Sequence, residues 1–157
     1  MIDAKRRILL KGSLAAGSVG VAVGAGLLSP RLVLAEWNQG AFEAKDVPGA
    51  LSALLGGDAT ETSDAIQIKA PDIAENGAVV PVTVETSLEG VKSIAIFAAG
   101  NATPLIANFD LGESALPFVS TRIKMGKTAD VVAVVKTADK LLSNAKNVKV
   151  TIGGCGG

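Results

Sequence analysis

The chain lacks several side chains on which much protein chemistry depends. Among its 157 residues there is no histidine, no tyrosine and a single cysteine. Without histidine there can be no Ser-His-Asp or Cys-His nucleophile pair, no imidazole general base and no histidine-ligated haem. One thiol excludes an internal disulfide, a CxxC redox pair and a thiolate zinc cluster. We therefore expect no metal and no cofactor on this chain.

Aromatic residues are also scarce, at 3%, so valine, isoleucine, leucine and alanine must build the core. The length and the 48% hydrophobic content fit one compact domain. Residues 1–35 carry five basic side chains against one acidic, whereas residues 36–157 carry ten basic and fourteen acidic ones. This mildly acidic body has no basic stripe, and nucleic acid is not an expected partner.

The first 35 residues have the three-part layout of an export signal. Arg6 and Arg7 stand in a basic start, residues 12–30 form an uncharged run, and small side chains precede a cut after Ala35. The adjacent arginines look like a twin-arginine signal. A membrane anchor is disfavoured because residues 12–28 are short for a core of ~30 Å and rich in glycine. We expect the bacterial periplasm, with no membrane attachment after cleavage.

One helix is predicted in residues 42–57. Asp46 is a candidate N-cap and Pro48 suits the first turn. Three leucines form an apolar stripe, and Gly56 and Gly57 end the helix.

Beyond the helix, the pattern favours strands. Short alternating or Val/Thr-rich segments recur between turn residues, and Pro81 indicates an edge or a bulge in one of them. The pattern predicts an all-β fold for residues 36–152: an immunoglobulin-like antiparallel β-sandwich of about seven strands with a short N-terminal helix. The seven predicted strands are residues 65–70, 78–86, 91–98, 104–110, 117–124, 130–137 and 147–152.

The last five residues carry the only thiol. Cys155 lies between Gly153-Gly154 and Gly156-Gly157, directly after the alternating strand that ends at Ile152. Glycine fixes no backbone conformation, so residues 153–157 are predicted to form a flexible arm. The arm can hold the sulfur roughly 10 Å from the domain and is slender enough for a narrow channel.

Nothing in the sequence near Cys155 activates its thiol. The nearest basic residue is Lys149, six positions before it. At the reference pKa of about 8.5, only a few per cent is thiolate at neutral pH. This favours a passive attachment point over a thiol enzyme such as a peroxidase or transferase. An incidental cysteine on a structural or interaction sandwich and an intermolecular disulfide remain alternatives.

These features resemble one known family. Residues 148–157 (VKVTIGGCGG), residues 68–82 (IKAPDIAENGAVVPV) and the paired arginines are similar to SoxY, the carrier of the bacterial thiosulfate-oxidising system. Lys5 and Leu9 depart from the typical twin-arginine pattern. The resemblance implies a carrier that is not an enzyme, with Cys155 as the covalent sulfur attachment point and Gly153, Gly154, Gly156 and Gly157 as its swinging arm.

The resemblance also implies partners. A SoxZ-like β-sandwich subunit would form a heterodimer with the carrier. A haem enzyme would couple thiosulfate oxidatively to the cysteine, and a dimanganese hydrolase would release sulfate. A sulfur dehydrogenase is a further partner for the remaining sulfane.

Overall fold

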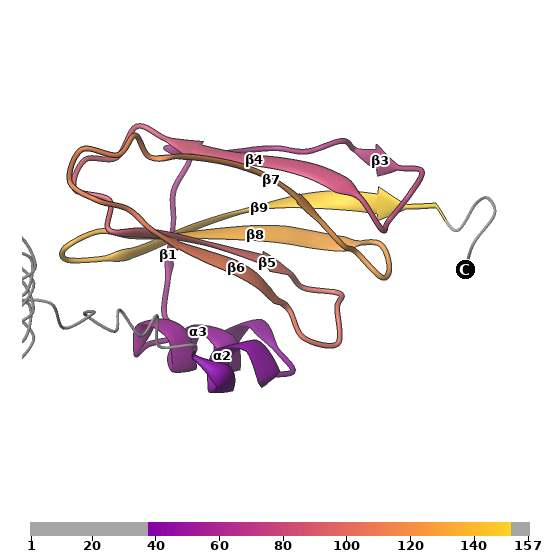
Figure 1. Ribbon diagram of the computed structural model, residues 1–157, viewed down its shortest axis with the longest axis horizontal. Helices are drawn as coiled ribbons and strands as arrows, with labels where there is room; N and C mark the ends of the chain where they lie inside the picture. The colour runs from indigo at the N-terminus through magenta and orange to yellow at the C-terminus, as the bar shows by residue number, and fades with distance from the viewer. Residues whose placement is uncertain (1–37, 152–157) are drawn as a thin grey trace, which may run out of the picture. The chain divides into compact units, whose positions relative to one another are not determined.

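The computed structural model describes residues 38–151. The predicted export signal (1–35), the predicted arm (153–157) and the predicted domain boundaries at 36 and 152 lie outside these residues. The described part contains two short helices and nine strands (Figure 1). The strands are β1 (Glu61–Thr62), β2 (Ile66–Lys69), β3 (Ile73–Ala74), β4 (Val80–Thr86), β5 (Ser93–Ala98), β6 (Leu105–Asp110), β7 (Phe118–Ile123), β8 (Ala129–Lys136) and β9 (Leu141–Val150).

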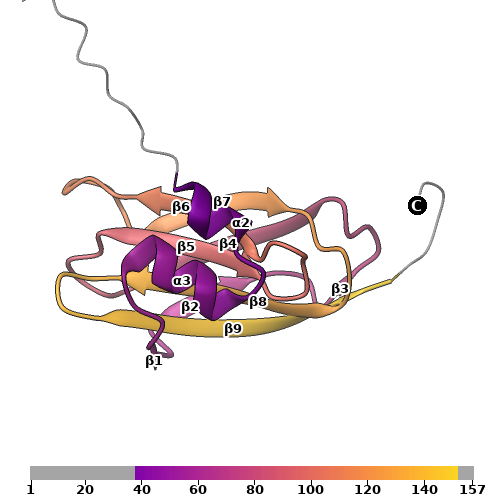
Figure 2. The same cartoon turned by 90° about the horizontal axis from the view of Figure 1, so that it is seen from below.

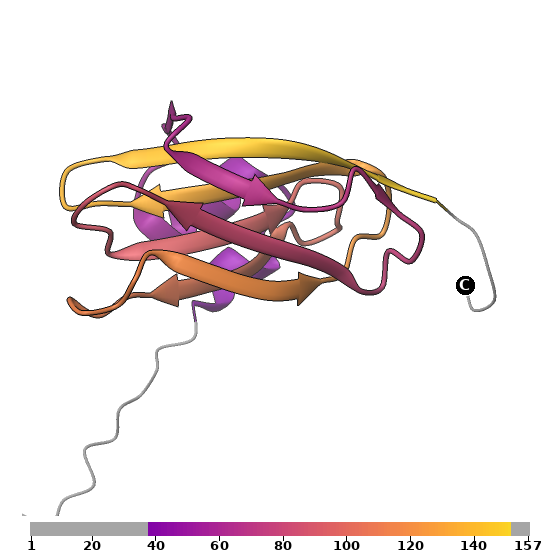
Figure 3. The same ribbon diagram turned by 90° about the horizontal axis from the view of Figure 1, so that it is seen from above.

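The strands form two layers, which confirms the predicted β-sandwich. The larger sheet has the order β1-β9-β8-β5-β6, and β3 also pairs with β9. The smaller sheet has the order β2-β4-β7 and lies over one face of the larger one (Figures 1 and 3). The long ladders are antiparallel, as predicted, but β1 and β3 pair with β9 in parallel.

The seven predicted strands correspond to β2 and β4–β9. Two details of the prediction were wrong. β9 runs from Leu141 to Val150, whereas the predicted strand ran from 147 to 152. The early start was missed because residues 141–144 are all half-buried and show no alternation. β1 and β3 were missed because a two-residue strand is too short to show a period.

Pro81 lies in the central strand of the smaller sheet, and no bulge interrupts its ladder with β7. Pairing of β4 with β2 begins only at Thr83. Pro81 therefore stands where β4 has a neighbour on one side only, and its missing N–H costs no hydrogen bond on the open side.

The predicted helix is α3 (Val47–Leu55), and its predicted boundaries are confirmed. The Asp46 carboxylate accepts a hydrogen bond from the Gly49 N–H at 2.7 Å. Gly56 ends the helix in the left-handed conformation, with φ 79°. A second helix, α2 (Gln39–Glu43), was not predicted, and the Asn38 side chain ties it to α3 through a 2.7 Å bond to the Ala53 carbonyl.

The two helices cover the outer face of the larger sheet (Figure 2). Ala41, Ala50 and Leu51 from the helices pack with side chains of β5, β6 and β8. This explains why every residue of β5 is buried: Ile94 and Ile96 face the smaller sheet, whereas Phe97 faces the helices.

A second cluster fills the space between the two sheets. It is built from aliphatic side chains, mostly valine and isoleucine, as the low aromatic content predicts. Val148 of β9 is fully buried in this cluster. The terminal strand is therefore anchored in the core up to three residues before the last described residue, Thr151.

Candidate functional site

The predicted site residues, Cys155 with Gly153, Gly154, Gly156 and Gly157, lie outside the described residues. The structure describes the segment that leads to them, the end of β9 at Val150 and the following Thr151. Cys155 comes four residues after Thr151, a reach of at most about 14 Å for an extended chain. The geometry around residues 149–151 therefore decides where the predicted arm begins.

One edge of this segment is held by β3. The Lys149 N–H donates to the Asp72 carbonyl at 2.9 Å, and the Thr151 N–H donates to the Ala74 carbonyl at 3.0 Å. Ile73 pairs in parallel with Lys149. The two segments that resemble the SoxY family, one in the middle of the sequence and one at its end, thus lie side by side in the fold.

Gly77 packs against the same end of β9. Its carbonyl accepts a 2.7 Å hydrogen bond from the Met125 N–H. A Cβ atom at this position would overlap the Met125 carbonyl oxygen and lie 2.7 Å from Val150 Cγ1. The turn after β3 can approach β9 this closely only because it has glycine here.

We predict that Gly77→Ala destabilises the protein by about 1–3 kcal/mol, because the Met125 backbone must shift to admit the methyl group. The free energy of unfolding from a urea titration measures the effect. Gly112→Ala is the matched control, since nothing lies within 4 Å of its Cβ position. Equal stability of the two variants would contradict the close packing at Gly77.

Charged side chains of both signs lie near this end of the sandwich. The β5–β6 turn and the β7–β8 loop enclose an open hollow of about 580 Å³, and Lys124 and Lys127 are among its lining residues. Lys146 forms a 3.1 Å ion pair with Asp72. Lys124 and Lys127 are exposed, so their fields are screened, and the charge of the less exposed Lys146 is balanced by Asp72. Because Asp72 and Glu75 are also exposed beside β3, the net field near the end of β9 is weak and does not by itself select an anion.

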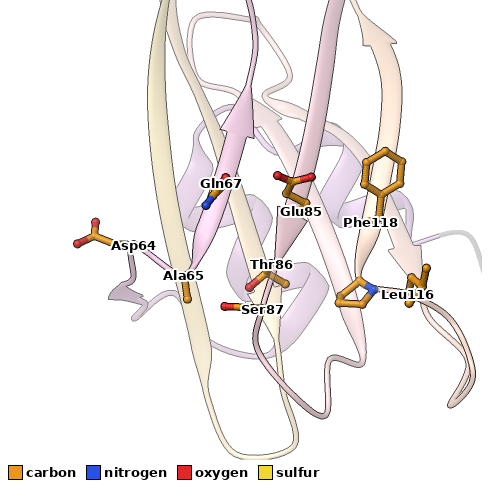
Figure 4. A pocket seen from close by; sticks show the side chains of 9 residues that line it. Asp64, Ala65, Gln67, Glu85, Thr86, Ser87, Leu116 and Phe118 are labelled. Carbon is orange, nitrogen blue, oxygen red and sulfur yellow. The ribbon is translucent and has the colours of Figure 1, made fainter.

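A second hollow, of about 440 Å³, opens on the outer face of the smaller sheet (Figure 4). Glu85 and Phe118 lie in it, with Asp64 and the highly exposed Leu116 at its margin. It lies at the Thr86 end of β4, whereas the end of β9 lies toward Val80. Val80 and Thr86, at opposite ends of β4, are six residues apart along the strand, which is about 20 Å. Its carboxylates do not suit an anionic ligand.

Within residues 38–151, no three acidic, cysteine or histidine side chains are grouped closely enough to hold a metal ion. In the same range, no helix is long and apolar enough to cross a membrane.

The sulfur oxidation protein SoxY family model matches residues 51–155. This range covers two thirds of the chain, from α3 to the single cysteine. The chain belongs to the SoxY family. Members of this family are sulfur carriers of the Sox system and act with other Sox proteins.

Solved structures agree with this assignment. The sulfur carrier protein SoxY from Chlorobium limicola f thiosulfatophilum is 48% identical, with a TM-score of 0.60, over 66% of this chain and 94% of that chain. A superoxide reductase (neelaredoxin) from Ignicoccus hospitalis reaches a TM-score of 0.53 at 16% identity, over 59% of this chain and 95% of that chain. The second likeness shows the fold alone. No curated protein matches the chain.

Sequence reasoning missed the residues that hold the end of this SoxY-family chain's last strand. Residues 71–77 fall between two predicted strands, 65–70 and 78–86, and the pairing of this segment with β9 was not predicted. Only the resemblance of residues 68–82 to the family marked the segment as special. Thr128, described below, gave no signal, because a single threonine in a loop has no distinguishing pattern.

Proposed function

We propose that this chain is a periplasmic carrier that holds oxidised sulfur intermediates covalently on Cys155 and presents them to partner enzymes. The observation that carries the proposal is the SoxY match, which extends through residue 155 and so includes the only thiol. The periplasmic location is supported by the paired Arg6 and Arg7 and by the predicted cut after Ala35.

The proposed chemistry follows from a thiol and thiosulfate. The Cys155 thiolate and the outer sulfur of thiosulfate form a disulfide bond, and the two electrons released pass to a haem enzyme. Water then attacks the terminal sulfonate, which leaves as sulfate and two protons, and a persulfide remains on Cys155. Both steps need catalysts that we place on the partners, since this chain has no histidine to act as a base.

An arm of five residues suits a carrier that must visit several enzymes. Ordering each backbone residue costs about 1–2 kcal/mol, with glycine at the upper end, so each docked state is weak and short-lived. Four glycines also leave the thiol as the only side chain that must pass through a channel. A thiol enzyme needs the opposite, a cysteine held in a structured, electropositive niche.

The proposed partners follow from the same family assignment. They are a SoxZ-like β-sandwich subunit, the haem enzyme that couples thiosulfate, a dimanganese hydrolase that releases sulfate, and a sulfur dehydrogenase. The resident metals of this cycle belong to the partners.

Intact-protein mass spectrometry tests the proposal. Protein purified without reductant from cells oxidising thiosulfate is expected to carry a sulfur atom, a sulfonate or a thiosulfonate on Cys155. Treatment with dithiothreitol removes adducts held by sulfur–sulfur bonds and serves as the control. Protein from active cells that never carries any of these masses would refute the covalent carrier.

A further inference from the structure

Residues 149–151, the last three that the structure describes, have every backbone N–H occupied. The Lys149 N–H donates to the carbonyl of Asp72, the residue before β3, and the Thr151 N–H donates to the carbonyl of Ala74 in β3. The N–H of Val150 points to the other edge and donates to the Thr128 hydroxyl at 2.9 Å. The same hydroxyl donates back to the Val150 carbonyl at 3.4 Å. One side chain thus satisfies both backbone groups of Val150.

Thr128 acts where the main-chain ladder stops. The last pair between β8 and β9 joins Ala129 and Val148, so no β8 backbone group reaches Val150. A valine side chain at position 128 has nearly the same shape but offers no hydroxyl. Without the hydroxyl, β9 would be held on the β3 edge only, and its end would behave as a fraying edge strand.

The loop that carries Thr128 is itself fixed. The Asn101 amide donates to the Lys124 carbonyl at 2.7 Å and accepts from the Gly126 N–H at 2.9 Å. The Met125 N–H donates to the Gly77 carbonyl. These bonds join the loop to the β5–β6 turn on one side and to the turn after β3 on the other. The loop, fixed by these hydrogen bonds, therefore holds the Thr128 hydroxyl beside Val150.

We propose that Thr128 is a positioning residue for sulfur transfer. Together with the carbonyls of Asp72 and Ala74 it forms a clasp that places the pivot of the carrier arm at Thr151. The clasp keeps the arm short, so the thiol samples a small volume and meets a docked enzyme's site at a high effective concentration. This role rests on the proposed carrier function, but the clasp can be tested separately from it.

The test compares Thr128→Val with Thr128→Ser, which keeps the hydroxyl. Hydrogen exchange of the Val150 amide, followed by NMR, is expected to be roughly fivefold faster in Thr128→Val and unchanged in Thr128→Ser. In a reconstituted assay, KM of the thiosulfate-coupling enzyme for the carrier is expected to rise with kcat unchanged. The rise is at most roughly twofold, the value for full release of two more residues, because the β3 edge still holds β9 for part of the time.

A matched variant separates arm length from stability. Inserting Gly-Gly after Ile152 lengthens the arm beyond the clasp, and it is expected to reproduce the KM increase while Val150 exchange stays at the wild-type rate. Unchanged Val150 exchange in Thr128→Val would overturn the clasp. Faster exchange with unchanged KM would overturn the positioning role. If wild-type protein accepts no sulfur at all, the carrier function fails, and the exchange result still decides whether the clasp exists.

Discussion

Cys155→Ser is expected to reduce thiosulfate-dependent electron transfer to the background rate of a reaction mixture that lacks the carrier. Serine is nearly the same size as cysteine, but its hydroxyl is not ionised at neutral pH and cannot form a sulfur–sulfur bond. With a single cysteine in the chain, no other side chain can take over the attachment. Reduction of cytochrome c in a system reconstituted with the partner enzymes measures the loss.

The same variant is expected to keep the fold. Both core clusters are built from residues between Ala41 and Val148, so the unfolding midpoint in urea should equal that of the wild type. A Cys155→Ser protein that is inactive but fully folded would show that the loss of activity comes from the missing thiol and not from lower stability. Thiosulfate oxidation above background in this variant would contradict the covalent carrier and would favour an interaction sandwich with an incidental cysteine.

Phe97→Ala is expected to cost about 3–5 kcal/mol of unfolding free energy. Phe97 is fully buried in the cluster between the helices and the larger sheet, where it packs with Leu51 of α3. Truncation leaves a cavity that its small neighbours, mostly alanine and valine, cannot fill. The total free energy of unfolding of a domain of this size is about 5–15 kcal/mol, so this loss is a large share of it. Urea unfolding followed by circular dichroism gives the value.

Phe118→Ala is the matched control, since Phe118 is the same residue type in strand β7 but 53% exposed. Its removal is expected to change stability by no more than about 1 kcal/mol. If the two alanine variants were equally stable, the helices would not be packed on the sheet through Phe97.

Much of the fold could be predicted because its signals are local. Asp46, Pro48 and Gly56 mark α3 by the chemistry of helix ends, which depends only on near neighbours. Alternating residues mark the longer strands in the same way. The helix layer was only half predicted: α2 is five residues long, and its place on the sheet depends on the Asn38 bond to α3, fifteen residues away in the sequence.

Strand β5 shows a different limit of prediction from the sequence. A strand buried on both faces has no alternation, so residues 93–98 could be recognised as a strand, but not as the strand that lies between the second sheet and the helices. Which face receives the helices depends on the packing of Ala95 and Phe97 against residues more than forty positions earlier.

By itself the sequence determined which chemistry is open to this protein, because reactivity depends on which side chains are present. One thiol, no histidine and a run of glycines favour a carrier over an enzyme. Only the tertiary structure decided where the last strand is held. Thr151 and Ala74 are 77 residues apart, and the bonds at this point are made largely by backbone groups that every residue shares. No side-chain pattern encodes such bonds, so the pairing of β3 with β9 and the bond from Thr128 emerge only when the sandwich is assembled.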